Sequence, residues 1–323
     1  MADRVRERDV RISGLRIHIR EVGEGRPLLL LNGLGAPTAW WSTLEGHLDG
    51  VRLIEFDAPG VGGSQTPWLP TRVEYLGWLA ARVLDHVNVQ RADVLGYSLG
   101  GMIAQHLAAR SPERVRRLVL TSTGCGFGGV QAGITKLLNV GTPLRFMSKG
   151  LYERTLPDLV GGRARSDPEF LERHRERRFT SPPNKRGYML QTIALGGWSS
   201  LPVLSRIQAP TFVVTGDDDP LMPLPNAYLL ARRIPNARLH VAVGEGHLLL
   251  MDEQSSAFAP IRAVLRAKSL ERTQVWRNAT VVEDAALAAV MPESKGAGRA
   301  LGLPGTAWRR AWRPPARSVG QRA

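Results

Sequence analysis

Short apolar runs alternate with stretches of helical periodicity along most of this chain. The runs PLLLL, VRLIEF, ADVLG, RRLVL and TFVV are each followed by polar or glycine-bearing turns. Continuous apolar runs of this length are typical of strands buried on both faces, as in parallel sheets. Helices are predicted between them at residues 73–87, 102–110, 227–233 and 253–267. This alternation predicts an α/β fold, with a mostly parallel central sheet wrapped by helices.

Two segments depart from this alternation. Near the start, Leu15, Ile17 and Ile19 alternate with polar residues, which predicts a β-hairpin ahead of the parallel strands. Between residues 124 and 205 the chain becomes rich in Gly, Pro and Arg, with only short helical pieces. Insertions at the carboxyl edge of such sheets are where lids over active sites lie. We therefore expect a core of residues 1–123 and 206–268, interrupted by a helical cap at residues 124–205.

Positive charge gathers toward the carboxyl terminus. The chain has 43 Lys and Arg against 29 Asp and Glu, a net charge of +14. Residues 269–323 are rich in Gly, Pro, Ala and Arg and lack sustained apolar periodicity, so we predict a basic, disordered tail. Its Arg and Trp residues make it a candidate anchor for an anionic surface, and a tolerated terminal extension is the alternative. We expect no specific nucleic-acid partner.

The remaining composition excludes several classes of protein. The first ten residues lack the apolar core of a secretory signal, and no run of about 18 apolar residues suggests a transmembrane segment. We therefore expect a cytoplasmic protein. The single cysteine, Cys125, excludes an internal disulfide framework and any cysteine-cluster metal site. We expect Cys125 to be a small buried residue rather than a nucleophile.

The pattern Gly-x-Ser-x-Gly occurs at residues 96–100, with Ser98 at its centre. Glycine and serine are common enough that the pattern alone carries little information. Here, however, it follows an apolar strand and opens a helix, which is the arrangement of a nucleophile elbow. The sharp turn exposes the serine hydroxyl, and the two glycines leave room for neighbouring backbone. Ser98 is therefore the candidate nucleophile.

A serine hydroxyl needs a base to become nucleophilic at neutral pH. Among seven histidines, His247 is the candidate, because it follows the last predicted strand, within ARLHVAVGEGH, on a glycine-bearing loop. The carboxylate that orients this base is expected between the serine and the histidine in chain order. Asp217, Asp218 and Asp219 lie there, directly after the strand TFVV, and the spacing leaves the choice among them open. No further ligand cluster supports a metal site, and we expect neither metal nor cofactor.

The oxyanion formed during acyl transfer needs two backbone N–H donors. One is expected at Leu99, directly after the nucleophile. The other is expected at Leu34, in the loop that follows the first parallel strand, with Asn32 bracing that loop. The glycine-rich stretches NGLG and PGVGG fit neither dinucleotide-binding nor Walker A spacing, so phosphate binding is not indicated.

These residues resemble an α/β-hydrolase-fold serine hydrolase. More narrowly, the chain resembles intracellular depolymerases that act on medium-chain-length poly(3-hydroxyalkanoate). The resemblance is carried by LLLLNGLG, FDAPGVGGSQTP, GYSLGG, SPERVRRLVLTST, ALGGWSSL, GDDDPLMPLPNAYLLARRIPNARLHV and GEGHLLL, and it covers roughly residues 27–265. Leu99 is a departure, since the family more often has tryptophan after the serine. The spacing of Asp219 from Gly216, with Pro223 following, matches the family and selects Asp219.

The resemblance implies ester hydrolysis through an acyl-enzyme, with Ser98 as nucleophile, His247 as general base and Asp219 orienting it. The implied partner is a polyester granule, with association of the cytoplasmic enzyme with that granule as one expectation. A small-molecule carboxylesterase or lactonase and a carbon–carbon bond hydrolase with the same triad are the enzymatic alternatives. A granule-bound structural protein is the non-enzymatic alternative. The presence of every triad residue argues against it.

Overall fold

The central element of the computed structural model, which describes residues 5–143, 146, 148–180 and 182–291, is an eight-stranded sheet. Its strand order is β1-β2-β4-β3-β5-β6-β7-β8. The strands β3 to β8 run parallel to their neighbours, whereas β1 and β2 form an antiparallel hairpin and β2 joins β4 antiparallel. The mostly parallel sheet and the initial hairpin expected from the sequence are confirmed. The strands are β1 (Val5–Ile12), β2 (Leu15–Val22), β3 (Arg26–Leu31), β4 (Val51–Phe56), β5 (Ala92–Tyr97), β6 (Val115–Thr121), β7 (Thr211–Gly216) and β8 (Ala237–Ala242).

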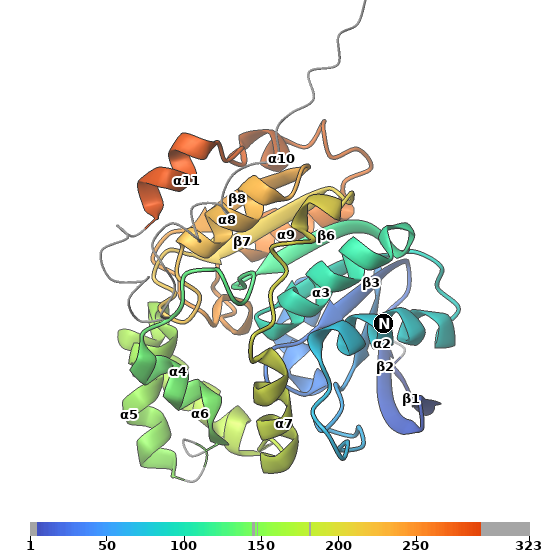
Figure 1. Ribbon diagram of the computed structural model, residues 1–323, viewed down its shortest axis with the longest axis vertical. Helices are drawn as coiled ribbons and strands as arrows, with labels where there is room; N and C mark the ends of the chain where they lie inside the picture. Colours follow the sequence, from blue (N-terminus) through green and yellow to red (C-terminus); the bar gives the residue numbers. More distant parts are fainter. Residues whose placement is uncertain (1–4, 144–145, 147, 181, 292–323) are drawn as a thin grey trace, which may run out of the picture.

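Helices cover both faces of the sheet (Figure 1). One face packs against α2 (Val73–His86), α3 (Leu99–Arg110) and α8 (Pro225–Arg233). The other face packs against α1 (Ser42–Glu45) and α9 (Phe258–Arg266). The helix expected at residues 253–267 thus begins later, at Phe258. Ser255 and Ser256 instead form a turn in which both hydroxyls donate hydrogen bonds to Glu245.

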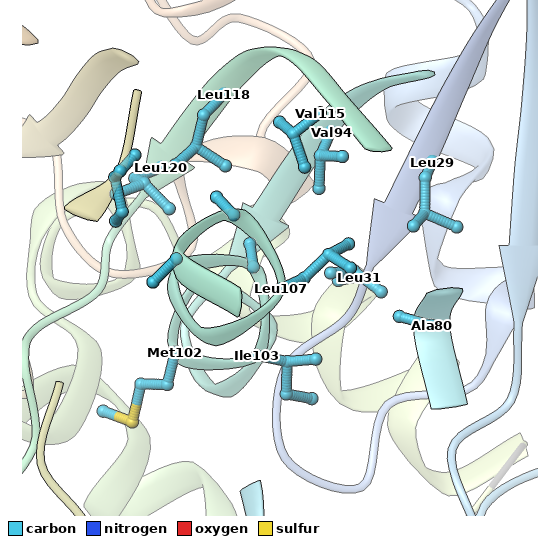
Figure 2. Close-up of a cluster of buried hydrophobic side chains, with 14 of the residues drawn as sticks. Leu29, Leu31, Ala80, Val94, Met102, Ile103, Leu107, Val115, Leu118 and Leu120 are labelled. Atoms are coloured by element: carbon cyan, nitrogen blue, oxygen red, sulfur yellow. The ribbon is translucent and has the colours of Figure 1, made fainter. Parts of the chain in front are cut away.

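The core lies on both sides of the sheet, because successive side chains of a strand point to opposite faces. In β3, Leu29 and Leu31 belong to the cluster around α2 and α3, while Leu28 and Leu30 belong to the cluster around α9. Figure 2 shows apolar side chains from β3, β5 and β6 arranged around α3. The helix that follows Ser98 is therefore held firmly against the centre of the sheet.

Between β6 and β7 the chain leaves the core, and the described residues of this segment form four α-helices. They are α4 (Ile134–Gly141), α5 (Lys149–Val160), α6 (Pro168–Thr180) and α7 (Lys185–Leu195). Figure 1 shows them grouped together beside one edge of the sheet. We call residues 124–205 the cap.

The carboxyl-terminal segment differs from the expectation of a disordered tail from residue 269. Residues 269–291 are ordered and contain α10 (Gln274–Asn278) and α11 (Asp284–Val290). Trp276 is buried beside Phe212, and Leu287 is buried in the cluster around α8. Apolar residues in the first part of the segment are thus sufficient to pack it onto the core. The remainder of the predicted basic tail, including Trp308 and Trp312, lies outside the described residues.

Candidate active site

The candidate residues lie on loops that leave one edge of the parallel sheet. Strands β3, β5, β7 and β8 are parallel to their neighbours, so their carboxyl ends share that edge. The loop after β3 carries Leu34, β5 is followed directly by Ser98, β7 by Asp219, and β8 by His247. Four distant segments of the sequence are therefore brought together by sheet topology alone.

Ser98 occupies the sharp turn between β5 and α3. Its φ of 53° and ψ of −118° lie in a region that non-glycine residues rarely adopt, so this backbone is strained. The turn is fixed by the Ser98 N–H, which donates to Thr121 O at 3.0 Å, and by the Thr123 hydroxyl, which donates to Ser98 O at 2.7 Å. A Cβ at Gly100 would overlap the carbonyl oxygen of Leu31, so the close approach of helix and strand requires glycine there.

Ser98, His247 and Asp219 form one buried chain of hydrogen bonds. His247 Nε2 lies 3.1 Å from Ser98 Oγ, and His247 Nδ1 lies 2.8 Å from Asp219 Oδ2. An ionised carboxylate can only accept hydrogen bonds, so Nδ1 carries the proton and Nε2 is left to accept one from the serine. The structure thus brings together the three side chains that the sequence analysis selected.

The neighbouring aspartates have other partners. Asp217 Oδ1 accepts from the Gly244 N–H at 2.6 Å, which ties the loop after β7 to the loop after β8. Asp218 Oδ2 accepts from the Gly162 N–H at 2.7 Å, and its Oδ1 pairs with Arg165 in the cap. The choice that spacing alone left open therefore has a geometric answer, because of the three only Asp219 bonds His247.

Leu99 and Leu34, the two predicted oxyanion donors, line the same cavity as Ser98. Leu99 is the first residue of α3, where the helix dipole and unpaired N–H groups favour negative charge. Asn32 braces the loop that carries Leu34, as expected. Asn32 Oδ1 accepts from the Gly33 N–H at 2.8 Å, and Asn32 Nδ2 donates to Pro37 O at 3.0 Å. A Cβ on Gly33 would stand 3.4 Å from the Cβ of Ser98, so this loop passes close to the serine.

A cavity of about 420 Å³ opens between the sheet edge and the cap. Ser98 and His247 lie in its wall together with Leu34 and Leu99. Most of the other wall residues are apolar or aromatic, and α4, α5 and α7 all contribute to the wall. The buried Arg178 guanidinium also lines the cavity and stacks against the rings of Trp40 and Phe146. The space is suited to an apolar substrate group held beside the serine.

Contacts that the sequence analysis missed hold the histidine loop. The Tyr97 hydroxyl donates to His247 O at 3.0 Å, and the His247 N–H donates to Val160 O at the end of α5. Burial raises the pKa of Tyr97 well above its usual value, so the phenol stays protonated and able to donate. The position of Tyr97 within the Gly-x-Ser-x-Gly pattern does not indicate this role, because the bond depends on the tertiary placement of a distant loop.

Three further observations concern the cysteine, metal binding and membrane crossing. Burial raises the pKa of Cys125 to about 12, so its thiol is not ionised at neutral pH. Across the described part of the chain, no group of three or more His, Cys, Asp or Glu side chains is placed to hold a metal ion. Nor is any helix in that part both long and apolar enough to cross a membrane.

Comparison with known proteins agrees with this architecture. A family model described as the alpha/beta hydrolase fold matches residues 26–254, which include Ser98, Asp219 and His247. The chain belongs to the α/β-hydrolase fold family. The fold expected from the resemblance is thereby confirmed.

Several α/β hydrolases are similar to this chain. A poly(3-hydroxyalkanoate) depolymerase of Ectopseudomonas oleovorans is 42% identical over 73% of this chain and 82% of its own length. A 2-hydroxy-6-oxononadienedioate/2-hydroxy-6-oxononatrienedioate hydrolase of Comamonas testosteroni is 29% identical over 73% of this chain and 86% of its own length. Among solved structures, a hydrolase from Pseudomonas aeruginosa PA01 superposes with a TM-score of 0.67 at 26% identity, covering 81% of this chain and 98% of its own.

Proposed function

We propose that this α/β hydrolase cleaves ester bonds through an acyl-enzyme on Ser98 and that its substrate is a poly(3-hydroxyalkanoate). The observation that carries the proposal is the hydrogen-bonded chain from Ser98 through His247 to Asp219 on the wall of an apolar cavity. The 42% identity with a poly(3-hydroxyalkanoate) depolymerase supports the polymer as substrate.

The proposed reaction has two halves. His247 Nε2 takes the proton of Ser98 Oγ as Oγ bonds to the ester carbonyl carbon, and the Leu34 and Leu99 N–H groups hold the oxyanion. The C–O bond to the leaving alcohol then breaks, and the alcohol oxygen takes the proton from His247. Water next attacks the acyl carbon and gives its proton to His247. The bond to Oγ breaks, Oγ recovers that proton, and the hydroxy acid leaves.

Exposed apolar side chains on the cap support the proposal that the substrate is insoluble in water. Ile134 and Leu138 of α4 are 70% and 62% exposed, and Ile193 of α7 is 54% exposed. Phe127 and Leu137 are exposed and also line the cavity, so apolar surface continues from the outside of the cap to the serine. Exposed apolar groups gathered at a cavity mouth suit contact with a hydrophobic phase such as a polyester granule. The proposal therefore includes granule association of the cytoplasmic enzyme.

A second candidate is hydrolysis of a carbon–carbon bond in a diketone acid. The observation that favours it is Arg178, whose guanidinium lines the cavity and would attract a substrate carboxylate. The Comamonas testosteroni relative is named for a nonadienedioate and a nonatrienedioate, which carry such carboxylates.

One comparison of substrates tests both candidates. Wild type and Ser98→Ala are assayed on amorphous medium-chain poly(3-hydroxyalkanoate) granules, on p-nitrophenyl octanoate and on an enolisable diketone acid. We expect hydroxy-acid release from granules that disappears in Ser98→Ala. Cleavage of the soluble ester alone would refute the polymer substrate and leave a carboxylesterase or lactonase. Preference for the diketone acid would favour the second candidate.

A further inference from the structure

Gly35, in the loop that carries Leu34, is surrounded by side chains of the cap. Its N–H donates to Gln191 Oε1 of α7 at 2.9 Å, and its carbonyl oxygen accepts from Arg178 Nη1 of α6 at 3.1 Å. Gly35 has a φ of +63°, and a Cβ there would stand 2.5 Å from the ring of Tyr188. The cap thus holds both polar groups of a residue that belongs to the core.

Gln191 is well placed for this role because its surroundings are fixed. Its side chain is 2% exposed. The α7 helix that carries it is capped by Asn184, whose Oδ1 accepts from the Gly187 N–H at 2.9 Å. One turn before Gln191, the Tyr188 hydroxyl donates to Val140 O of α4 at 2.7 Å. A buried amide on an anchored helix can hold a loop in one orientation.

The Leu34 N–H belongs to the peptide unit between two fixed neighbours. On its amino side, Asn32 holds the Gly33 N–H. On its carboxyl side, Gln191 holds the Gly35 N–H. Because adjacent peptide planes rotate only about φ and ψ, fixing both flanking units fixes the direction of the Leu34 N–H between them. The Gly33 carbonyl oxygen, in the same peptide unit as the Leu34 N–H, also accepts from the Ala36 N–H at 3.2 Å. Releasing Gly35 from Gln191 would loosen this turn next to Ala36 and let the Leu34 donor turn away from the oxyanion.

We propose that Gln191 is a positioning residue, through which the cap aims the Leu34 N–H at the oxyanion. This inference rests on the proposed ester hydrolysis, in which Leu34 supplies one of two oxyanion donors. Gln191 itself acts through the loop and not on the substrate. Its loss should therefore lower kcat, because the donor works in the transition state, and should leave KM little changed.

The test uses full-length variants and p-nitrophenyl octanoate. Gln191→Met removes the acceptor with little change in size, and Gln191→Glu keeps an oxygen that can accept from Gly35. Gln105→Met is the matched control. Gln105 is another buried glutamine whose side chain makes two hydrogen bonds, as that of Gln191 does with Gly35 and Pro59. The partners of Gln105 are Ser200 and Gly124, and neither belongs to the Leu34 loop. Tm, kcat, KM and the rate of inactivation by a p-nitrophenyl alkylphosphonate are measured for each.

We expect Gln191→Met to lower kcat about 10- to 100-fold, less than or equal to the loss of a whole oxyanion donor. KM should change less than about threefold, phosphonylation should slow with kcat, and Gln191→Glu should recover a substantial part of the loss. Gln105→Met should lower Tm similarly while changing kcat much less. If Gln191→Met does not fold, Gln191→Asn, whose amide is too short to reach Gly35, takes its place under the same criteria.

Equal kcat losses in Gln191→Met and Gln105→Met would overturn the inference, as would an effect confined to KM or no recovery in Gln191→Glu. Failure of the proposed function has a different signature. Wild type would then lack esterase activity, or Ser98→Ala would keep it, and the inference would fall together with the function.

Discussion

Asp219→Asn is expected to preserve the fold and to abolish nearly all turnover, for a reason visible in the hydrogen bonds of this carboxylate. Asp219 Oδ1 accepts from the N–H groups of Leu221 at 3.0 Å and Met222 at 2.8 Å, while Oδ2 faces His247 Nδ1. In the variant, the amide oxygen must occupy the Oδ1 position, because an NH₂ group cannot accept from two N–H donors. The amide nitrogen then faces His247.

That orientation of the amide reverses the tautomer of His247. Nδ1 must accept a hydrogen bond from the amide, so the imidazole proton moves to Nε2, which faces Ser98 Oγ at 3.1 Å. A protonated Nε2 cannot take the serine proton. Trapping the wrong tautomer in a serine triad lowers kcat by about 10⁴, which corresponds to roughly 5 kcal/mol of lost transition-state stabilisation. The two backbone bonds to the amide oxygen remain, so Tm should fall by no more than a few degrees.

The assay is kcat for p-nitrophenyl octanoate, with Tm measured on the same preparations. Asp217→Asn is the matched control, because it makes the same substitution two residues away. The amide oxygen of this variant can still accept from the Gly244 N–H, so its kcat should stay within about threefold of wild type. An Asp219→Asn enzyme that keeps more than a tenth of wild-type kcat would refute the reasoning. So would an equal loss in Asp217→Asn, since that would indicate damage to the loop and not to the tautomer.

Two further outcomes are expected. Burial raises the pKa of Glu55 from 4.5 to about 8 despite its hydrogen bond to Arg20 at 2.8 Å. Between these two pH values the folded state holds a proton on Glu55 that the unfolded state has lost, so the free energy of unfolding falls as the pH rises. In thermal melts, the Tm of Glu55→Gln should therefore rise relative to that of wild type between pH 5 and pH 8. A Tm difference that does not depend on pH would contradict the raised pKa. Trp276→Ala should cost about 3 kcal/mol and lower Tm by about 6 °C, because the ring is buried beside Phe212. A Tm change below about 1 °C would contradict docking of this segment on the core.

The fold could be predicted because its information is local and repeated. Short apolar runs in the sequence indicate the buried strands, and parallel strands must place their carboxyl ends at the same edge of the sheet. Ser98 follows β5 directly and His247 lies on the loop after β8, so their meeting could be predicted from order along the chain. Asp219 needed more, because three adjacent carboxylates follow one strand. The family resemblance selects Asp219, and the hydrogen-bond partners of the three aspartates give the same choice a physical reason.

The part that sequence reasoning missed is structure set by tertiary contacts. The sequence analysis includes residues 269–291 in a basic tail, because the average composition of residues 269–323 conceals a few well-spaced apolar residues such as Trp276 and Leu287. Gln191 carries no motif at all. Its hydrogen bond to Gly35 joins residues that are 156 positions apart, and neither residue type is unusual where it stands. Long-range polar contacts of this kind leave no periodicity in the sequence.

The contacts of the cap also indicate how substrate can reach the serine. Val160, at the end of α5, accepts from the His247 N–H, and the Gly162 N–H that follows donates to Asp218. Gln191 of α7 holds the loop of Leu34. Displacing α5 or α7 would therefore disturb the very loops that carry the reacting groups. The α4 helix has no buried residue and lines the cavity, and moving it would break the Tyr188–Val140 bond to α7 before it disturbed the loops that carry the reacting groups. We expect an end of the polyester chain, the proposed substrate, to enter past α4 while α5 and α7 hold the catalytic loops in place.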